Sequence, residues 1–125
     1  MPGAGRAVFI VDDEAIIAQT LAIILNQAGF TAIAFERPRD AIAAAAGAAP
    51  DLLISDVMMP EMTGVELAIH FRTFHPGCKV LLFSGQASTA DLLNEARSQG
   101  YDFDLITKPV HPVDLLAKLR SHDKF

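Results

Sequence analysis

Acidic residues directly follow two of the apolar stretches of the chain. "FIVDDE" carries Asp12 and Asp13, and "LISDVMMP" carries Asp56. Three carboxylates that met in one cleft would repel one another unless a proton or a cation lay between them. Magnesium is bound in proteins through one or two carboxylates, water and phosphate oxygens. If the fold brings these stretches together, the sequence therefore predicts a site for a hard divalent cation.

Two further polar residues follow later apolar stretches. "FSGQA" contributes Ser84, and "ITKPV" contributes Lys108. A carboxylate is a known nucleophile in phosphoryl transfer and then forms an aspartyl phosphate. A lysine supplies a compact positive charge for phosphate oxygens, and a hydroxyl donates a hydrogen bond to them. The residue types therefore indicate that Asp56 accepts a phosphoryl group, which Lys108 and Ser84 bind.

These residues need a fold that places them together, and the rest of the chain indicates one. Five apolar or β-branched stretches are expected to be strands: 7–11, 31–35, 52–55, 79–84 and 104–107. Helical patterns cover 14–28, 38–46, 64–75, 88–99 and the segment after Pro112. In the first helix, the pattern places Ile17, Leu21, Ile24 and Ala28 on one stripe. Strands that alternate with helices predict an α/β fold with a parallel sheet and right-handed crossovers.

The strand count fits the doubly wound order 2-1-3-4-5, in which the first and third strands are neighbours. Ligands bind such sheets at the carboxyl ends of the strands, where the order reverses. Each polar residue alone has a structural explanation: an acidic pair can cap a helix, and a lysine before proline can be a solvated loop residue. Their joint placement at matched strand ends favours a site instead.

The composition limits the classes of protein that remain. The 125 residues are enough for one domain, 1–125, and 51% of them are hydrophobic, which argues against disorder. A net charge of −5 disfavours direct binding to nucleic acid. The single cysteine, Cys78, excludes an intrachain disulfide and is expected to fill a small space in the core. Neither a signal peptide nor a membrane span is evident, so we expect a soluble, cytoplasmic protein without a membrane partner.

Four motifs together resemble the receiver domain of bacterial response regulators: "VDDE", "DVMMP", "FSG" and "TKP". The resemblance covers residues 6–120 and implies a flavodoxin-like sheet with Mg2+ as cofactor. It implies that Asp56 is the phosphoacceptor, and that Asp12, Asp13 and the backbone carbonyl of Met58 bind the metal.

The resemblance also implies how the switch operates. Lys108 would contact the phosphate, and the Ser84 hydroxyl would move toward it on activation. The phosphoryl group would come from a histidine kinase or a histidine phosphotransfer protein, and the last helices and strand would then bind a downstream protein target. Such a domain catalyses only its own phosphorylation and dephosphorylation. The chain ends shortly after its last helix, so we expect no output domain in it.

The chain departs from the family pattern before Lys108. The family usually places Tyr or Phe three residues before this lysine, where the chain has Leu105, and "GYDFDLITKP" is one residue longer than the common form. Either Phe103 takes over the aromatic role or signalling through this strand differs, although Tyr101 and Phe103 could simply pack in the core. Met58 and Gln86, at positions that tune the phosphate lifetime in the family, offer neither an acid nor a base.

Two other classes of function are less well supported. A phosphohydrolase of the haloacid-dehalogenase type would need an acid two residues after its nucleophile, where this chain has Met58. A flavin carrier would need a phosphate-binding loop rich in Ser and Thr after the first strand, whereas "DDEA" repels phosphate unless a cation is present.

Overall fold

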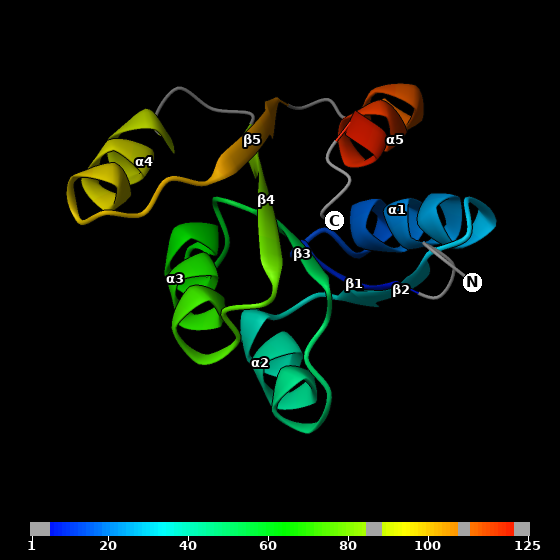
Figure 1. Ribbon diagram of the computed structural model, residues 1–125, viewed down its shortest axis with the longest axis horizontal. Coiled ribbons are helices and arrows are strands. Elements are labelled where there is room, and N and C mark those ends of the chain that lie inside the picture. The colour runs from blue at the N-terminus through cyan, green and yellow to red at the C-terminus, as the bar shows by residue number, and fades with distance from the viewer. Residues whose placement is uncertain (1–5, 85–88, 108–110, 122–125) are drawn as a thin grey trace.

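A computed structural model of the chain describes residues 6–84, 89–107 and 111–121. In this part of the chain, one parallel sheet is covered by helices on both faces (Figure 1). The strands are β1 (Ala7–Val11), β2 (Thr31–Phe35), β3 (Leu52–Asp56), β4 (Lys79–Ser84) and β5 (Asp104–Thr107). The helices are α1 (Ala15–Gln27), α2 (Pro38–Gly47), α3 (Gly64–Phe74), α4 (Thr89–Ser98) and α5 (Pro112–Ser121).

The strand order is β2-β1-β3-β4-β5, as predicted from the alternation of strands and helices. The predicted and observed element bounds differ by at most one residue, except that α5 was predicted only by its start. This order places β1 next to β3, although α1, β2 and α2 separate the two strands in the sequence. The first and third strand ends therefore meet, as the doubly wound fold requires.

The core has two parts, one on each face of the sheet. α1 and α5 cover one face, where Leu25 and Leu115 pack against Ile54 of β3 and its neighbours. α2, α3 and α4 cover the other face, where Phe71 packs near Leu53. Successive β3 residues point to opposite faces, so all five of them are buried. The continuous apolar run in the sequence follows from this burial on both sides.

The buried face of α1 differs from the predicted stripe. The helix buries a different set of four residues: Ala18, Leu21, Ala22 and Leu25. Of the predicted stripe only Leu21 is fully buried, and Ile17, Ile24 and Ala28 are half-buried. Two of the four buried residues are alanines, whose small side chains allow a helix backbone to lie close to a sheet. The prediction of the buried face was therefore wrong: the observed face is rotated about the helix axis by about one residue position from the predicted stripe.

Asn26 of α1 is hydrogen-bonded to both backbone polar groups of Ala32 in β2. Its Nδ2 donates to the Ala32 carbonyl (3.1 Å), and its Oδ1 accepts from the Ala32 N–H (2.8 Å). β2 lies at an edge of the sheet. The Asn26 carboxamide thus forms the two backbone hydrogen bonds that a neighbouring strand would otherwise form with Ala32.

Cys78 is buried in the core between α3 and β4, as expected from the sequence. Desolvation by burial, with a smaller contribution from the Asp51 carboxylate, raises the pKa of its thiol from 9.0 to about 12. A thiol that stays protonated is a poor nucleophile, so Cys78 fills space and is not a reactive group.

Candidate metal and phosphorylation site

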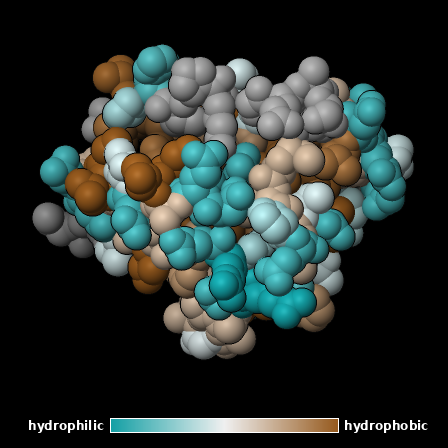
Figure 2. Space-filling model, turned by 180° about the vertical axis from the view of Figure 1, so that it is seen from behind, coloured by the Kyte–Doolittle hydropathy of each residue, from teal (hydrophilic) through white to brown (hydrophobic). Residues whose placement is uncertain are grey.

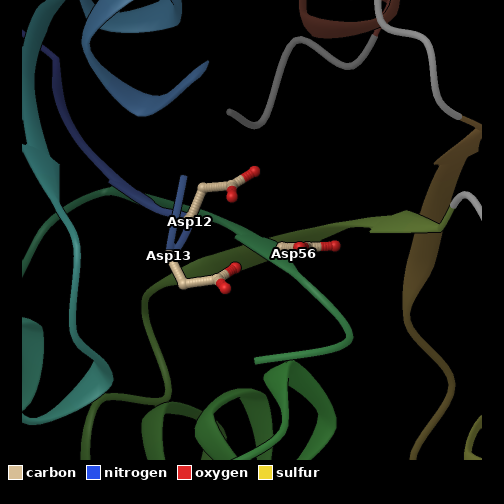
Figure 3. A group of neighbouring side chains, drawn as sticks. All are labelled: Asp12, Asp13 and Asp56. Atoms are coloured by element: carbon tan, nitrogen blue, oxygen red, sulfur yellow. The ribbon is translucent and has the colours of Figure 1, made fainter. Parts of the chain in front are cut away.

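The register of the central strands brings three carboxylates to one edge of the sheet. Val11 of β1 lies opposite Ser55 of β3, so the residues that follow them, Asp12 and Asp56, come side by side. Asp13 follows at the same edge, and Figure 3 shows the three side chains gathered there. One carboxylate oxygen from each of the three residues lies within 4.8 Å of the others.

The burial of these carboxylates makes their proximity costly. Asp12 is completely buried and Asp56 exposes only 8% of its surface, whereas Asp13 is exposed. Like charges so close together repel one another unless a positive charge lies among them. An all-oxygen set of carboxylate donors suits a hard divalent ion such as Mg2+ and does not suit a metal that prefers sulfur or imidazole ligands. The donor chemistry of this cluster therefore fits the predicted metal.

Backbone hydrogen bonds fix the chain around Asp12. Its N–H donates to the carbonyl of Phe35 at the end of β2 (3.1 Å), which extends the β1–β2 pairing by one residue. Its Oδ1 accepts from the N–H of Glu14 (2.9 Å), where the chain turns into α1. The Asp12 side chain is thereby oriented before any ligand arrives.

The chain around Asp56 is held on both sides. The Ser55 hydroxyl donates to the Asp56 carbonyl (2.9 Å), and the N–H of Val57 donates to the carbonyl of Phe83 in β4 (3.1 Å). The N–H of Gly64, the first residue of α3, donates back to the Val57 carbonyl (2.8 Å). The loop after β3 therefore closes tightly on the strand end that carries Asp56.

Gly64 makes a close contact that the sequence reasoning missed. A Cβ on this residue would lie 2.0 Å from the backbone oxygen of Asp56 and 2.8 Å from its carbonyl carbon. Only glycine permits so close an approach between the start of α3 and the end of β3 that carries Asp56. Thr63 and Glu66 form a capping box that begins α3 at this point. The "TGVE" motif contains the S/T-x-x-E signal that would have predicted this cap.

The remaining predicted site residues lie near this edge or outside the described part of the chain. Ser84, half-buried, ends β4 one residue beyond Phe83, which pairs with Asp56. Met58 lies two residues after Asp56, and its side chain is 41% exposed. Lys108 and Gln86 lie outside the described residues.

The aromatic residues before β5 pack in the core. Phe103 is buried, its ring stacks on that of Tyr101 with the centroids 6.1 Å apart, and the Arg72 guanidinium carbon lies 5.2 Å from its centroid. Leu105, at the position where the family usually has an aromatic residue, is 38% exposed. Of the interpretations considered, this geometry favours core packing for both aromatic residues.

A cleft adjoins the carboxylate cluster through Asp13. It has a volume of about 510 Å3 and lies between the segment after β2 and the loop after β3. The described residues that line it, here called the Asp13 cleft, are Asp13, Glu36, Arg37, Pro38, Pro60 and Glu61. The sequence gives no sign of this cleft, because its walls come from segments far apart in the chain and depend on how those segments lie relative to one another.

The strand order and the carboxylate cluster define a doubly wound α/β protein with acidic side chains at its switch point. The family profile of the response regulator receiver domain matches residues 8–120. The chain therefore belongs to the response regulator receiver domain family, whose members are signalling domains of two-component systems and not classical enzymes.

Individual proteins show the same similarity. The transcriptional regulatory protein CreB of Escherichia coli is 32% identical over 116 residues, which cover 93% of this chain and 50% of CreB. The probable transcriptional regulatory protein TcrX of Mycobacterium tuberculosis is 31% identical over 119 residues, 95% of this chain and 50% of TcrX. The chain thus spans about half the length of the curated relatives that it matches.

Solved structures agree in fold. A CheY-like receiver domain protein of Methanospirillum hungatei is 28% identical with a TM-score of 0.84, and the match covers 96% of this chain and 94% of that one. The chemotaxis response regulator CheY4 of Vibrio cholerae is 30% identical with a TM-score of 0.82, covering 94% of this chain and 98% of CheY4.

Within the described residues, each helix is too short or too polar to cross a membrane.

Proposed function

We propose that Asp56 accepts a phosphoryl group from a histidine kinase or a histidine phosphotransfer protein, and that the chain acts as a single receiver domain over residues 1–125. The observation that carries this proposal is the gathering of the Asp12, Asp13 and Asp56 carboxylates within 4.8 Å at the switch point. Family membership supports it, because two-component signalling proceeds through receiver domains.

Asp12, Asp13, Asp56 and the backbone carbonyl of Met58 would hold Mg2+. When bound, the ion supplies positive charge that offsets the carboxylates and the oxygens of the phosphoryl group. The rigid hydrogen bonding around Asp12 keeps one ligand in place, whereas the exposed Asp13 is free to adjust to the ion. This division suits a site that binds and releases its metal.

The chemical step belongs to Asp56. One of its carboxylate oxygens attacks phosphorus, and an O–P bond forms as the P–N bond to the donor histidine breaks. The electron pair of that bond returns to the imidazole nitrogen. The Lys108 ammonium group and the Ser84 hydroxyl then bind the oxygens of the transferred phosphoryl group.

The added negative charge would reorient Ser84 and shift the populations of the surface formed by α4, β5 and α5 toward a form that binds a downstream protein target. With Leu105 on this surface, the change would proceed without the aromatic side chain that the family usually uses. We place this switch in the cytoplasm, where kinases of this type act.

Phosphorylation of matched variants tests the proposal. Acetyl phosphate with Mg2+ should add one phosphoryl group to the wild type, as measured by intact-protein mass spectrometry, and none to Asp56→Asn. Asp104→Asn is the control, because it removes the same charge from an exposed position at the start of β5, whereas the carboxylate cluster lies at the carboxyl ends of the strands. A profile of phosphotransfer from candidate kinases would identify the donor. Equal modification of Asp56→Asn and the wild type would refute the assignment.

A further inference from the structure

The Asp13 cleft gives an open approach to the carboxylate cluster. It shares Asp13 with that cluster, and its volume of about 510 Å3 lies in the range of small-molecule sites. Figure 2 shows hydrophilic side chains across the lower middle of the face seen from behind, at the height of α2, while hydrophobic side chains gather on the side where α1 lies. A charged donor would approach over the hydrophilic region.

Arg37 occupies a fixed backbone position in this cleft. The hydrogen bond from the Asp12 N–H to the Phe35 carbonyl ties the end of β2 to the start of the acidic cluster, two residues before Arg37. The carbonyl of Arg37 accepts hydrogen bonds from the N–H groups of Asp40 (3.1 Å) and Ala41 (3.4 Å) as the N-cap of α2. The base of its side chain is therefore held beside the site.

The charges of the cleft give Arg37 a distinct role. Among the described residues that line the cleft, Asp13, Glu36 and Glu61 are acidic and Arg37 alone is basic. Within the same described residues, no carboxylate lies within ion-pair distance of the Arg37 guanidinium. An anionic donor that entered here would be repelled by three carboxylates and attracted by one guanidinium. The planar fork of arginine also matches the geometry of phosphate oxygens.

We propose that Arg37 binds the phosphoryl group of the incoming donor in the Asp13 cleft and guides it toward Asp56. The inference rests on the proposed phosphorylation of Asp56. The ligand chemistry is a phosphoryl dianion on a labile bond, as in an acyl phosphate or a phosphohistidine. No bond is made or broken at Arg37, and transfer proceeds at Asp56 as described above.

Two arginines of α2 and its N-cap provide a matched test. Arg37→Gln and Arg39→Gln remove the same charge two residues apart, but Arg39 does not line the cleft. With saturating Mg2+, the half-saturating concentration of acetyl phosphate should rise about tenfold in Arg37→Gln, the typical effect of losing a hydrogen bond to a charged group. The maximal rate should change little, Arg39→Gln should behave as the wild type, and Arg37→Lys should recover part of the affinity.

Magnesium affinity separates donor binding from a structural role. Loss of a positive charge near the cluster should leave Mg2+ binding unchanged or stronger by calorimetry. If Arg37 merely supported the Asp12 turn, its loss would instead weaken Mg2+ binding, and that result would overturn the inference. Removal of an acid from the opposite wall, in Glu61→Gln, should lower the half-saturating concentration of acetyl phosphate, and a rise in that variant would count equally against it.

The source of the phosphoryl group provides the last comparison. At donor concentrations below saturation, Arg37→Gln should slow transfer from acetyl phosphate and from a phosphorylated phosphotransfer protein alike, because the recognised group is the same. Slower transfer from the protein donor alone would mean that Arg37 contacts another part of that protein, which would overturn the inference. If Arg37→Gln and Arg39→Gln had equal effects while the wild type was phosphorylated normally, this inference would be overturned and the proposed function would stand. Failure of the wild type to be phosphorylated by either donor would refute the proposed function, and this inference with it.

Discussion

Replacement of Gly64 by alanine should damage both stability and phosphorylation. The new Cβ would lie 2.0 Å from the Asp56 carbonyl oxygen, so ordinary contact at 3.4 Å requires a shift of about 1.4 Å. The obstructing atoms belong to the backbone and cannot rotate away. Overpacking typically costs about 1–3 kcal/mol, and a backbone clash belongs at the upper end, so we expect the free energy of unfolding to fall by about 3 kcal/mol. For a domain of this size the melting temperature should drop by about 10 °C.

The same displacement bears on Asp56, the proposed phosphoacceptor. A misplacement of about 1 Å in a reacting group can cost about 100-fold in rate, so phosphorylation of the folded variant by acetyl phosphate should be slower by one to two orders of magnitude. Urea unfolding followed by circular dichroism measures the first effect, and mass spectrometry below the unfolding transition measures the second.

Gly47→Ala is the matched control for Gly64→Ala. A Cβ on Gly47, the last residue of α2, meets nothing within 4 Å. Alanine favours the helix over glycine by about 1 kcal/mol at interior positions, so this variant should be as stable as the wild type or slightly more so. If Gly64→Ala unfolds within about 1 kcal/mol of the wild type and is phosphorylated at the wild-type rate, the contact does not constrain the site as described.

Three further predictions concern separate parts of the molecule. Asp13→Asn should weaken Mg2+ binding about tenfold or more by calorimetry, and unchanged affinity would exclude it as a ligand. Without Mg2+ the variant should be at least as stable as the wild type in urea unfolding, since the carboxylate is exposed and its loss relieves repulsion within the cluster. Thr63→Ala removes the capping box of α3 and should cost about 1 kcal/mol in urea unfolding, whereas Thr63→Ser should retain most of it. Above pH 9.0, the Cys78 thiol ionises in the unfolded chain but stays protonated in the folded one up to about pH 12. The free energy of unfolding should therefore fall more steeply with rising pH in the wild type than in Cys78→Ala, and parallel slopes would contradict the raised pKa.

The fold and the carboxylate cluster could be predicted because each depends on a rule that acts within a strand or at its end. Continuous apolar runs indicate strands buried on both faces, and the strand order then decides which ends meet. Asp12 and Asp56 are 44 residues apart in the chain, yet their proximity follows from these two rules alone.

Features that depend on how closely two elements approach could not be predicted in this way. Hydropathy favoured Ile17 and Ile24 for the inner face of α1, but the helix buries Ala18 and Ala22 there, and small residues carry little hydropathic signal of their position. The demand for glycine at position 64 arises from contact with a backbone atom eight residues earlier. The Asp13 cleft depends on two loops from different parts of the sheet, and no local pattern encodes their separation.

The two hydrogen bonds between the Asn26 carboxamide and the backbone of Ala32 bear on self-association of the protein through its β2 edge. An open outer strand is a template on which a second copy can continue the sheet, and repetition of that step builds filaments. At Ala32 the template is already occupied by a carboxamide from the same molecule. A second copy therefore cannot pair with Ala32 as a neighbouring strand would, and continuation of the sheet along this edge is hindered at that residue.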